Sequence, residues 1–225
     1  DFPIELKRAE RRIANKMIEE FMLAANESVA NIAIEKKLPF VFRVHEEPDS
    51  ERIFKLSLFL SRIGLGGLRI KDKVKPKEVQ KLIEKSSGTK WEGVVSMLTL
   101  RSMAKAKYFQ ENLGHFGLAL DNYVHFTSPI RRYSDLLIHR ILKEGTSRDI
   151  PKVCEWISYT ERRANEAEME IKALKIAQYM SKFEGEIFEG TISSVTSFGI
   201  FVSLENTAEG LIRYDSEHEY FDVDE

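Results

Sequence analysis

The chain has 225 residues, and its 34 Lys and Arg residues against 36 Asp and Glu residues give a formal net charge of −2. With 43% hydrophobic and 31% charged residues, the composition is typical of a folded globular protein and excludes a disordered or low-complexity chain. The single cysteine, Cys154, excludes an internal disulfide and argues against a cysteine zinc site, so we expect a reducing, cytoplasmic environment.

The pattern of apolar and charged residues excludes two further classes of protein. No apolar stretch reaches the ~18–20 residues that a membrane-spanning helix needs, and the first residues lack the features of a signal peptide. Because the chain begins with Asp1 instead of Met, we expect it to belong to a longer protein. The charge is uneven: residues 205–225 hold eight acids and one base, which leaves 33 bases and 28 acids, a net charge of +5, over residues 1–204. That excess allows a local basic channel without demonstrating one.

The first part of the chain is predicted to be mostly helical. Apolar residues recur at spacings of three and four between Ile13 and Ile32, which predicts one long helix over residues 5–36. A run of aromatic and β-branched residues predicts a strand at 39–44, and the segment 46–50 follows it as a turn and helix cap. Further helices are expected at 51–63, 76–86 and 91–107, with a glycine- and lysine-rich loop between the first two.

The next part of the chain carries turn and cap signals. Residues 114–126 look like two strands around an Asp-Asn turn. Ser128 as the N-cap and Pro129 at the first helical position predict that a helix opens there. A last long helix is predicted from Asp149 to about residue 183.

The end of the chain follows a different apolar period. After Gly185 the period changes from 3.6 to 2, and three short runs predict a three-stranded antiparallel meander. We therefore expect one domain over residues 1–183 and a second over 184–225. The second domain looks incomplete, because a five-stranded OB barrel would need roughly 70 residues. The predicted fold class is α/β (α+β), helix-rich in the first domain and all-β in the truncated second.

The segment 125–140 carries the strongest charge signal. Arg131 and Arg132 fall in the first turn of the predicted helix, where the macrodipole makes each cation cost a few tenths of a kcal/mol up to ~1. A bound phosphate would remove that conflict, because the helix N-terminus, the Ser128 hydroxyl and a guanidinium fork all favour an anion. The alternative is that both arginines point away from the helix terminus and pair with carboxylates.

One motif stands out at residues 125–135, which read His-Phe-Thr-Ser-Pro-Ile-Arg-Arg-Tyr-Ser-Asp, preceded at 114–120 by Gly-His-Phe-Gly-Leu-Ala-Leu. It closely resembles the RNB catalytic domain of the RNase II/RNase R family, and the RNase R branch fits best. Other segments match in the same order, so the resemblance covers essentially the whole chain. It implies a processive, Mg²⁺-dependent 3′-to-5′ exoribonuclease that releases nucleoside 5′-monophosphates from single-stranded RNA. We expect the protein to be monomeric.

The metal site of that family is not visible in this sequence. In the family, a cluster of aspartates in the first half of the RNB domain holds the metal ions. Here the aspartates are scattered, at Asp49, Asp72, Asp121, Asp135 and Asp149. The chain therefore resembles the C-terminal half of the RNB domain, with the Mg²⁺ ligands expected upstream of Asp1, and we expect it not to degrade RNA alone. Asp135 and His139 could make half of a metal site, but without a third ligand a surface pair is the simpler interpretation.

Two other functions stay open. A non-catalytic RNA-binding protein could keep the RNB scaffold without the metal-binding aspartates. A helical protein-interaction scaffold is the third possibility, and it would not bind RNA. The sequence upstream of Asp1 decides between the first two, because an aspartate cluster there favours the enzyme.

The resemblance, carried over position by position, assigns two catalytic residues. Arg131 would contact the scissile phosphate and stabilise the charge that develops on it, and Glu168 matches a family glutamate near the 3′-terminal nucleotide. The alternatives are a solvated helix face for Glu168, packing for Tyr133, and hydrogen bonding at the edge of the core for Glu20 and Asn26. The RNA-binding residues implied in this domain are Thr127, Ser128, Arg132, Tyr133, Glu20 and Asn26.

Residues 184–225 resemble an OB-type RNA-binding domain of the kind found in ribosomal protein S1. Phe198 and Phe201 would supply a base-stacking platform, at roughly 1–3 kcal/mol per base, and Arg213 is a further candidate. Strand alternation places Phe198 on the face of Ile200 and Phe201 on the other face, so at least one ring is expected in the core. The acidic end of the chain opposes RNA affinity.

Overall fold

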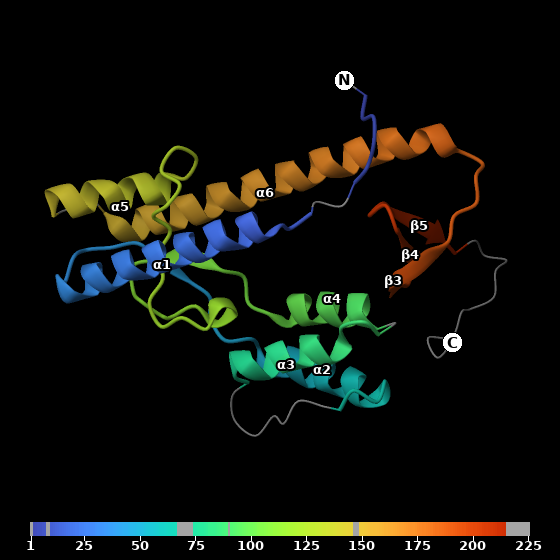
Figure 1. Cartoon of the computed structure of the whole chain (residues 1–225), viewed down its shortest axis with the longest axis horizontal. Helices are drawn as coiled ribbons and strands as arrows, with labels where there is room; N and C mark the ends of the chain where they lie inside the picture. Colours follow the sequence, from blue (N-terminus) through green and yellow to red (C-terminus); the bar gives the residue numbers. More distant parts are fainter. Residues whose placement is uncertain (1, 8–9, 67–73, 90, 146–148, 215–225) are drawn as a thin grey trace. The chain divides into compact units, whose positions relative to one another are not determined.

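The computed structural model describes residues 2–7, 10–66, 74–89, 91–145 and 149–214, which form mainly helices with two small antiparallel sheets (Figure 1). Asp72, the predicted loop from residue 67 to 73 and the acidic residues from 215 onward lie outside the described residues. No helix in the described ranges is long and apolar enough to cross a lipid bilayer. In chain order the elements are α1 (Ile13–Glu35), β1 (Phe42–Val44), α2 (Ser50–Arg62), α3 (Pro76–Ser86), α4 (Glu92–Ser102), β2 (Lys107–Phe109), the 3₁₀ helix η1 (Phe116–Leu118), α5 (Tyr133–Glu144), α6 (Ile150–Met180), the 3₁₀ helix η2 (Ser181–Phe183), β3 (Gly190–Thr196), β4 (Gly199–Leu204) and β5 (Glu209–Arg213).

The chain divides into two compact units, and α6 contributes to both. Unit 1 comprises Asp1–Glu10 with Ala164–Glu225, and unit 2 comprises Arg11–Arg163. Among the described residues, most of the buried apolar side chains of unit 2 form two clusters, and those of unit 1 are Ile200 and Ala208. The domain boundary predicted near residue 183 falls within unit 1 and stays a prediction.

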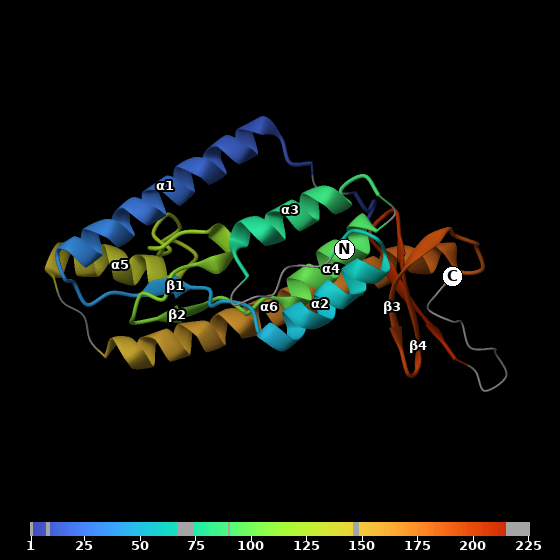
Figure 2. The same ribbon diagram turned by 90° about the horizontal axis from the view of Figure 1, so that it is seen from below.

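The larger cluster of unit 2 joins segments that are far apart in the sequence. β1 pairs antiparallel with β2, so that Phe42 lies opposite Phe109 and Val44 opposite Lys107. The second half of α1, α5 and the first part of α6 pack with this two-stranded ribbon (Figure 2). Val124, which precedes the sequence motif, is fully buried in the same cluster. The motif is therefore anchored directly in the core.

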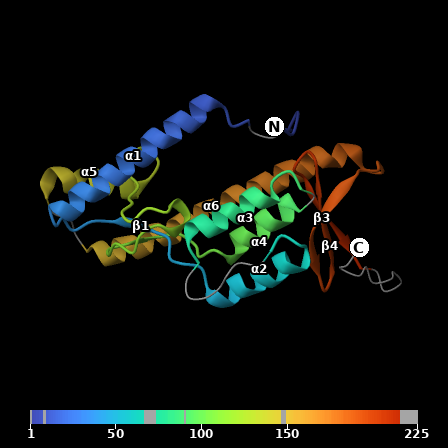
Figure 3. The same cartoon turned by 60° about the horizontal axis from the view of Figure 1, so that its bottom comes forward.

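The helices α2, α3 and α4 form the second cluster (Figure 3). Leu60 is fully buried there, and Ile53 and Leu82 are nearly so. The cap predicted within 46–50 is confirmed, and it is Asp49, whose Oδ1 accepts the Glu51 backbone N–H (2.8 Å) at the start of α2. The helices predicted at 51–63 and 76–86 are confirmed to within one residue.

The first long helix is shorter and less buried than its sequence pattern predicts. α1 begins at Ile13 and not at residue 5. At this start the Asn15 side chain accepts the Arg12 backbone N–H (3.2 Å). Its buried residues lie only between 26 and 33, and Ile13 is 85% exposed. Apolar periodicity therefore predicts the helix but not which part of it has a packing partner.

The second long helix is also buried over only part of its length. α6 covers nearly all of the predicted range, from Asp149 to about 183. Ile157 is buried in the core of unit 2, whereas Ile171 is 60% exposed in unit 1. Only the first part of the predicted apolar seam is buried.

A helix was predicted over residues 91–107, and its second part is wrong. α4 stops at Ser102, because Met103 takes an extended conformation. Residues 107–109 then pair with β1 as the strand β2. The partner strand lies more than 60 residues earlier, so the local sequence carries no signal for this pairing.

The prediction of two strands at 114–126 is also wrong. The 3₁₀ helix η1 lies in this segment, and isolated bridges join His115 to His45 and to Leu120. Gly114 and Ala119 take positive φ angles of 73° and 55°, and these turn the chain on either side of η1.

In unit 1 the predicted meander is confirmed, with the strand order β3-β4-β5. Ile200 lies opposite Ile212, and Phe201 opposite Leu211. A Cβ at Gly199 would lie 2.3 Å from the Ile212 carbonyl oxygen, so glycine permits the close approach of β4 and β5 at this point.

Candidate functional site

The helix start predicted at Ser128 is wrong, and the actual conformation defines the site. Residues 128–132 form a turn in which the Ser128 carbonyl accepts the backbone N–H groups of Arg131 (3.3 Å) and Arg132 (3.0 Å). The helix α5 begins only at Tyr133, with Arg132 as its N-cap. Arg131 therefore precedes the helix, so it does not stand in a helical first turn as the sequence pattern predicted.

A buried carboxylate holds the 128–132 turn. Asp135 is 0% exposed, and its Oδ1 accepts the Ser128 backbone N–H (2.8 Å) and an Arg132 guanidinium N–H (2.7 Å). Its Oδ2 accepts the Ser134 hydroxyl (2.9 Å). A carboxylate can be buried only when it is paired and hydrogen-bonded, and both oxygens meet that condition here. Asp135 thus ties both ends of the turn to α5.

The two adjacent arginines have different surroundings. The Arg132 side chain is 18% exposed and paired with Asp135, and its Nε is buried without a hydrogen-bond partner among the described residues. Arg131 is exposed, and no described carboxylate pairs with it. Pairing with a carboxylate, the alternative for both arginines, is therefore right for Arg132 and wrong for Arg131. In this structure Arg132 is bound to Asp135, and its contact with RNA stays a prediction from the resemblance.

Asn26 fixes the segment that leads into the turn. It is buried, its Nδ2 donates to the Tyr123 hydroxyl (3.1 Å), and its Oδ1 accepts the Phe126 backbone N–H (2.9 Å). Both ends of the Asn26 amide thus form hydrogen bonds within the protein, which fits the alternative of hydrogen bonding at the edge of the core. Glu20, on the same helix, is exposed.

His139 supports the same segment from α5. Its ring stacks on the Phe126 ring with centroids 4.1 Å apart, and its Nε2 lies 3.2 Å from the Phe126 carbonyl oxygen. Asp135 faces the turn instead, so neither the metal half-site nor the surface pair predicted for Asp135 and His139 is present. Thr127 has a buried hydroxyl with no partner among the described residues, and Ser128 is partly buried.

A cluster of rings and cations adjoins this segment. His125 Nδ1 lies 2.9 Å from the Tyr108 hydroxyl, and the Arg43 guanidinium lies 4.6 Å from the centre of the Tyr108 ring. Arg43 also pairs with Glu161 (2.6 Å). Burial, followed by the positive charges of Arg132 and Arg43, lowers the pKa of His125 to about 2, and burial raises the pKa of Tyr108. Sequence reasoning missed this cluster, because its members come from separate segments.

A second pair of histidines lies in the same unit. The rings of His45 and His115 are 5.2 Å apart, and the His115 ring lies equally far from that of Tyr123. His45 Nδ1 accepts the Gly117 backbone N–H (2.8 Å). Burial, followed by the charge of His45, lowers the pKa of His115 to about 4. Both histidines with shifted pKa values are therefore neutral at neutral pH.

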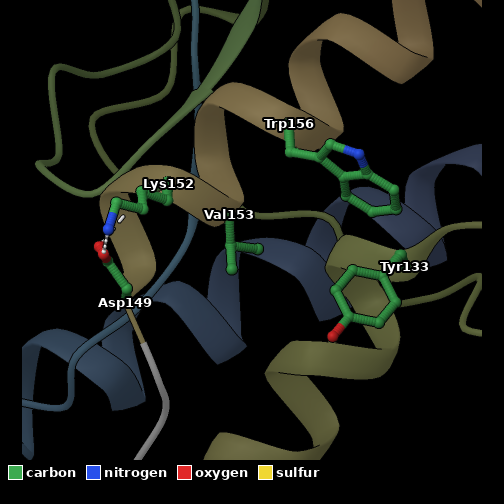
Figure 4. Close-up of a pocket in the computed structure, with 5 residues that line it drawn as sticks. All are labelled: Tyr133, Asp149, Lys152, Val153 and Trp156. Atoms are coloured by element: carbon green, nitrogen blue, oxygen red, sulfur yellow. Dashed lines mark hydrogen bonds and ion pairs between the residues drawn. The ribbon is translucent and has the colours of Figure 1, made fainter.

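Tyr133 lines an open hollow of about 400 Å³ between α5 and α6 (Figure 4). Its ring meets the Trp156 ring edge-on at 6.0 Å, with Val153 between the two helices. Asp149 and Lys152 form an ion pair at the rim (2.9 Å), which lowers the pKa of Asp149 and raises the pKa of Lys152. The hollow is thus lined by an ion pair and two aromatic rings, and Tyr133 contacts Trp156 while 43% of it stays exposed, so its proposed RNA contact stays a prediction.

Glu168 belongs to unit 1, on an exposed part of α6. Its carboxylate pairs with Lys172 (2.6 Å), and that hydrogen bond lowers the pKa of Glu168. This environment fits the solvated helix face that was the alternative for Glu168. It is not part of the network around Asp135, all of whose members lie in unit 2.

The aromatic residues of the meander share one side, contrary to the predicted alternation. The rings of Phe198 and Phe201 meet edge-on with centroids 6.2 Å apart. The alternation does not apply to Phe198, because it lies in the turn before β4, which begins at Gly199. Cross-strand register places Leu211 opposite Phe201 and Arg213 opposite Gly199, so their side chains share that face. Phe198 is 56% exposed.

The described residues do not fit a metal ion. No group of three or more His, Cys, Asp or Glu side chains that could hold one occurs in the described ranges. Cys154 is buried and free, and burial raises its pKa to about 11, so its thiol is not an activated nucleophile.

Two domain families match the sequence. The RNB domain matches residues 1–148, and the S1 RNA binding domain matches residues 181–216. The chain is 42% identical over 236 residues to Ribonuclease R 1 of Lactococcus lactis subsp. lactis, covering 99% of this chain and 29% of that protein. The chain thus spans about a third or less of the length of the relatives that it matches.

Solved structures share the fold. RNase R of Mycoplasma genitalium, in complex with ribose methylated single-stranded RNA, superposes with a TM-score of 0.88 at 29% identity, covering 94% of this chain and 35% of that one. Yeast Ssd1, described as a pseudonuclease, superposes with a TM-score of 0.73 at 21% identity, covering 93% and 28%. At that lower identity the likeness concerns the fold alone.

Proposed function

The chain belongs to the RNB family, and from that premise we propose that it is part of a 3′-to-5′ exoribonuclease that hydrolyses single-stranded RNA to nucleoside 5′-monophosphates. The observation that carries the proposal is the 128–132 turn. It presents Arg131 exposed and with no carboxylate partner among the described residues, whereas its neighbour Arg132 is bound to Asp135. A guanidinium left without a carboxylate is available for a phosphate.

Arg131 is the proposed catalytic residue. Its planar fork can donate two hydrogen bonds to the oxygens of one phosphate group, which an ammonium group cannot do in the same geometry. Charge on those oxygens grows as the phosphodiester bond breaks, so a fixed donor binds the transition state more strongly than the ground state. The neutral imidazole of His125 adds no charge to this region at neutral pH.

The metal-dependent part of the reaction has no ligands among the described residues. Mg²⁺ prefers oxygen ligands in octahedral geometry, and the described carboxylates are not gathered in that way. Dependence on Mg²⁺ is therefore proposed from the family alone, with ligands outside the described residues. This chain would supply the phosphate-binding side of the site.

Other residues are proposed to bind RNA outside the reacting phosphate. Phe198, Phe201 and Arg213 share one face of the meander and can offer rings to bases and a cation to a phosphate. Ser128 and the exposed Glu20 and Glu168 stay proposed contacts of the RNA strand. A cytoplasmic, monomeric protein stays the expectation from the sequence.

The proposal is tested first by RNA binding to the full chain. We expect weak binding of a single-stranded oligonucleotide that falls as salt rises, with a slope of roughly −0.7 per phosphate contact. Fluorescence anisotropy across a salt series measures both quantities. Affinity that does not change with salt would count against a phosphate-binding surface.

The second test is cleavage in a chimera. The segment of the Lactococcus lactis enzyme that matches this chain is replaced by the chain itself, and release of mononucleotides is compared with that of the parent enzyme. We expect the chimera to release nucleoside 5′-monophosphates and the isolated chain not to do so. A folded chimera that binds RNA but does not cleave it contradicts the enzymatic proposal.

A non-catalytic RNA-binding protein is the second candidate. Its basis is that the described residues contain no group of His, Cys, Asp or Glu side chains that could hold a metal ion. The chimera separates the two candidates, because a binding protein would give salt-dependent affinity without cleavage.

A further inference from the structure

We propose that Asp135 is a positioning residue for Arg131, acting through an internal ion pair with Arg132; this inference rests on the proposed function. In this arrangement the two neighbouring arginines have different roles. Arg132 is held inside the protein, and Arg131 is thereby presented to a phosphate of the RNA. The inference concerns the division of roles, which the matching sequence motif alone does not reveal.

The first support is the coordination of the Asp135 carboxylate. It is fully buried, and its three hydrogen bonds come from Ser128, Arg132 and Ser134. A carboxylate in this environment needs the Arg132 charge, because an unpaired buried charge is strongly destabilising. Moving Arg132 from Asp135 to a phosphate would leave the buried carboxylate unpaired and would destabilise the protein, so Arg132 stays bound to Asp135.

The second support is the place of Arg131 in the chain. It lies within the turn that Asp135 closes, because Ser128 at one end and Arg132 at the other both bind the same carboxylate oxygen. The backbone N–H groups of Arg131 and Arg132 also share the Ser128 carbonyl. The backbone at Arg131 is thus fixed while its side chain stays exposed. Holding a binding group in place before the ligand arrives reduces the entropy lost on binding.

The third support is a contrast within the same unit. Asp149 and Lys152 form another ion pair between residues three apart, at nearly the same separation (2.9 Å against 2.7 Å). Their side chains are 48% and 83% exposed, whereas Asp135 is 0% and Arg132 18% exposed. Asp149 Oδ1 also accepts the Lys152 backbone N–H (3.4 Å) at the start of α6, but this pair is exposed and does not bind the 128–132 turn, so it provides an exposed control for the buried pair.

The test is a double-mutant cycle in RNA affinity, measured on the full chain with a single-stranded oligonucleotide at low salt. Arg131→Ala should weaken binding roughly three- to tenfold, as the loss of one phosphate contact does. Asp135→Asn should weaken it by a similar factor, and the double variant should bind no more weakly than Arg131→Ala alone. Asp149→Asn should leave the RNA affinity unchanged. Arg132→Lys keeps the positive charge beside Asp135, so this variant should bind RNA nearly as tightly as the unsubstituted chain and more tightly than Asp135→Asn.

Hydrogen exchange, measured without RNA, shows whether the 128–132 turn loosens when the ion pair is removed. In Asp135→Asn, hydrogen exchange at the backbone N–H groups of Ser128, Arg131 and Arg132 should become faster, while that of Phe126, held by Asn26, should not. If Asp135→Asn does not fold, Arg132→Gln opens the same ion pair from the other side. Two results would overturn the inference and leave the proposed function standing. One is that the losses of RNA affinity in Arg131→Ala and Asp135→Asn add up in the double variant. The other is that Arg132→Lys binds RNA as weakly as Arg131→Ala. Absence of RNA binding by the unsubstituted chain overturns both.

Discussion

The candidate site of unit 2 and the candidate surface of unit 1 are built in opposite ways. In unit 2 the site is built on a buried, paired carboxylate: Asp135 is 0% exposed and accepts three hydrogen bonds. In unit 1 Phe198 and Phe201 stand on one face of a three-stranded sheet, and Phe198 is 56% exposed. A group that takes part in a bond-breaking step must be held in one place, whereas base stacking tolerates variation. The contrast fits the proposed division, with the chemical step in unit 2 and RNA binding in unit 1.

The largest expected effect tests the chemical role of unit 2. Arg131→Lys in the chimera keeps the charge but loses the guanidinium fork, and removing one such transition-state donor costs roughly 10²–10³ in rate, about 3–4 kcal/mol. RNA affinity should fall far less, because other phosphate contacts remain. Single-turnover cleavage beside equilibrium binding measures the two effects. Arg132→Lys is the matched control, and a larger rate loss there than in Arg131→Lys would reverse the assignment.

The next prediction concerns stability, and it contrasts a buried residue with an exposed one on the same helix. Asn26→Ala leaves the Phe126 backbone N–H and the Tyr123 hydroxyl without their partner, and an unsatisfied buried group costs about 1–3 kcal/mol. The free energy of unfolding in urea should fall by about 2 kcal/mol. Glu20→Gln should change it by less than about 0.5 kcal/mol, as is typical at exposed positions. Equal effects at the two positions would contradict the structural role of Asn26.

These two predictions show what the sequence could provide. The periodicity at α1, α2, α3 and α6 predicts the helices, because each of these patterns is local. The resemblance points to the segment around Arg131, which the structure forms as a turn held by Asp135, and the role of Arg131 stays a prediction. The sequence did not predict the conformation of that segment, since Ser128 and Pro129 are good helix-start residues and the buried Asp135 carboxylate overrides them.

The remaining differences have the same physical origin. β2 forms because it pairs with a strand more than 60 residues away, and Asn26 is buried because the chain returns to it about 100 residues later. The Arg132–Asp135 pair was within reach of sequence reasoning, because residues three apart are neighbours at a helix start. The cluster of Arg43, Tyr108 and His125 was not, because its members come from separate segments.

A pH prediction sharpens the contrast between buried and exposed groups. The pKa of His115 is about 4 in the folded protein, against about 6.5 in an unfolded chain. Between these values the unfolded state binds more protons, so stability should fall as the pH falls from 6.5 to 4. Because His115 is partly exposed, we discount the loss to about 1–2 kcal/mol. Urea unfolding at several pH values measures it, and His115→Asn should show a shallower decline than the parent chain over this window.

The smallest expected effect lies on the open sheet. Phe198→Ala should weaken RNA binding by about 1 kcal/mol, at the lower end of the range for stacking on one base, because the ring is only half covered and its neighbour Phe201 remains. Unlike Arg131→Ala, this change should leave the salt dependence of binding unaltered, since no phosphate contact is lost. Ile212→Ala is the matched control: Ile212 is 60% exposed but pairs with Ile200, which places it on the other face of the sheet. Anisotropy titrations of the three chains at two salt concentrations separate the cases. If Ile212→Ala weakens binding more than Phe198→Ala, RNA lies on the opposite face, and the proposed division between a chemical unit and a stacking surface needs a different set of residues in unit 1.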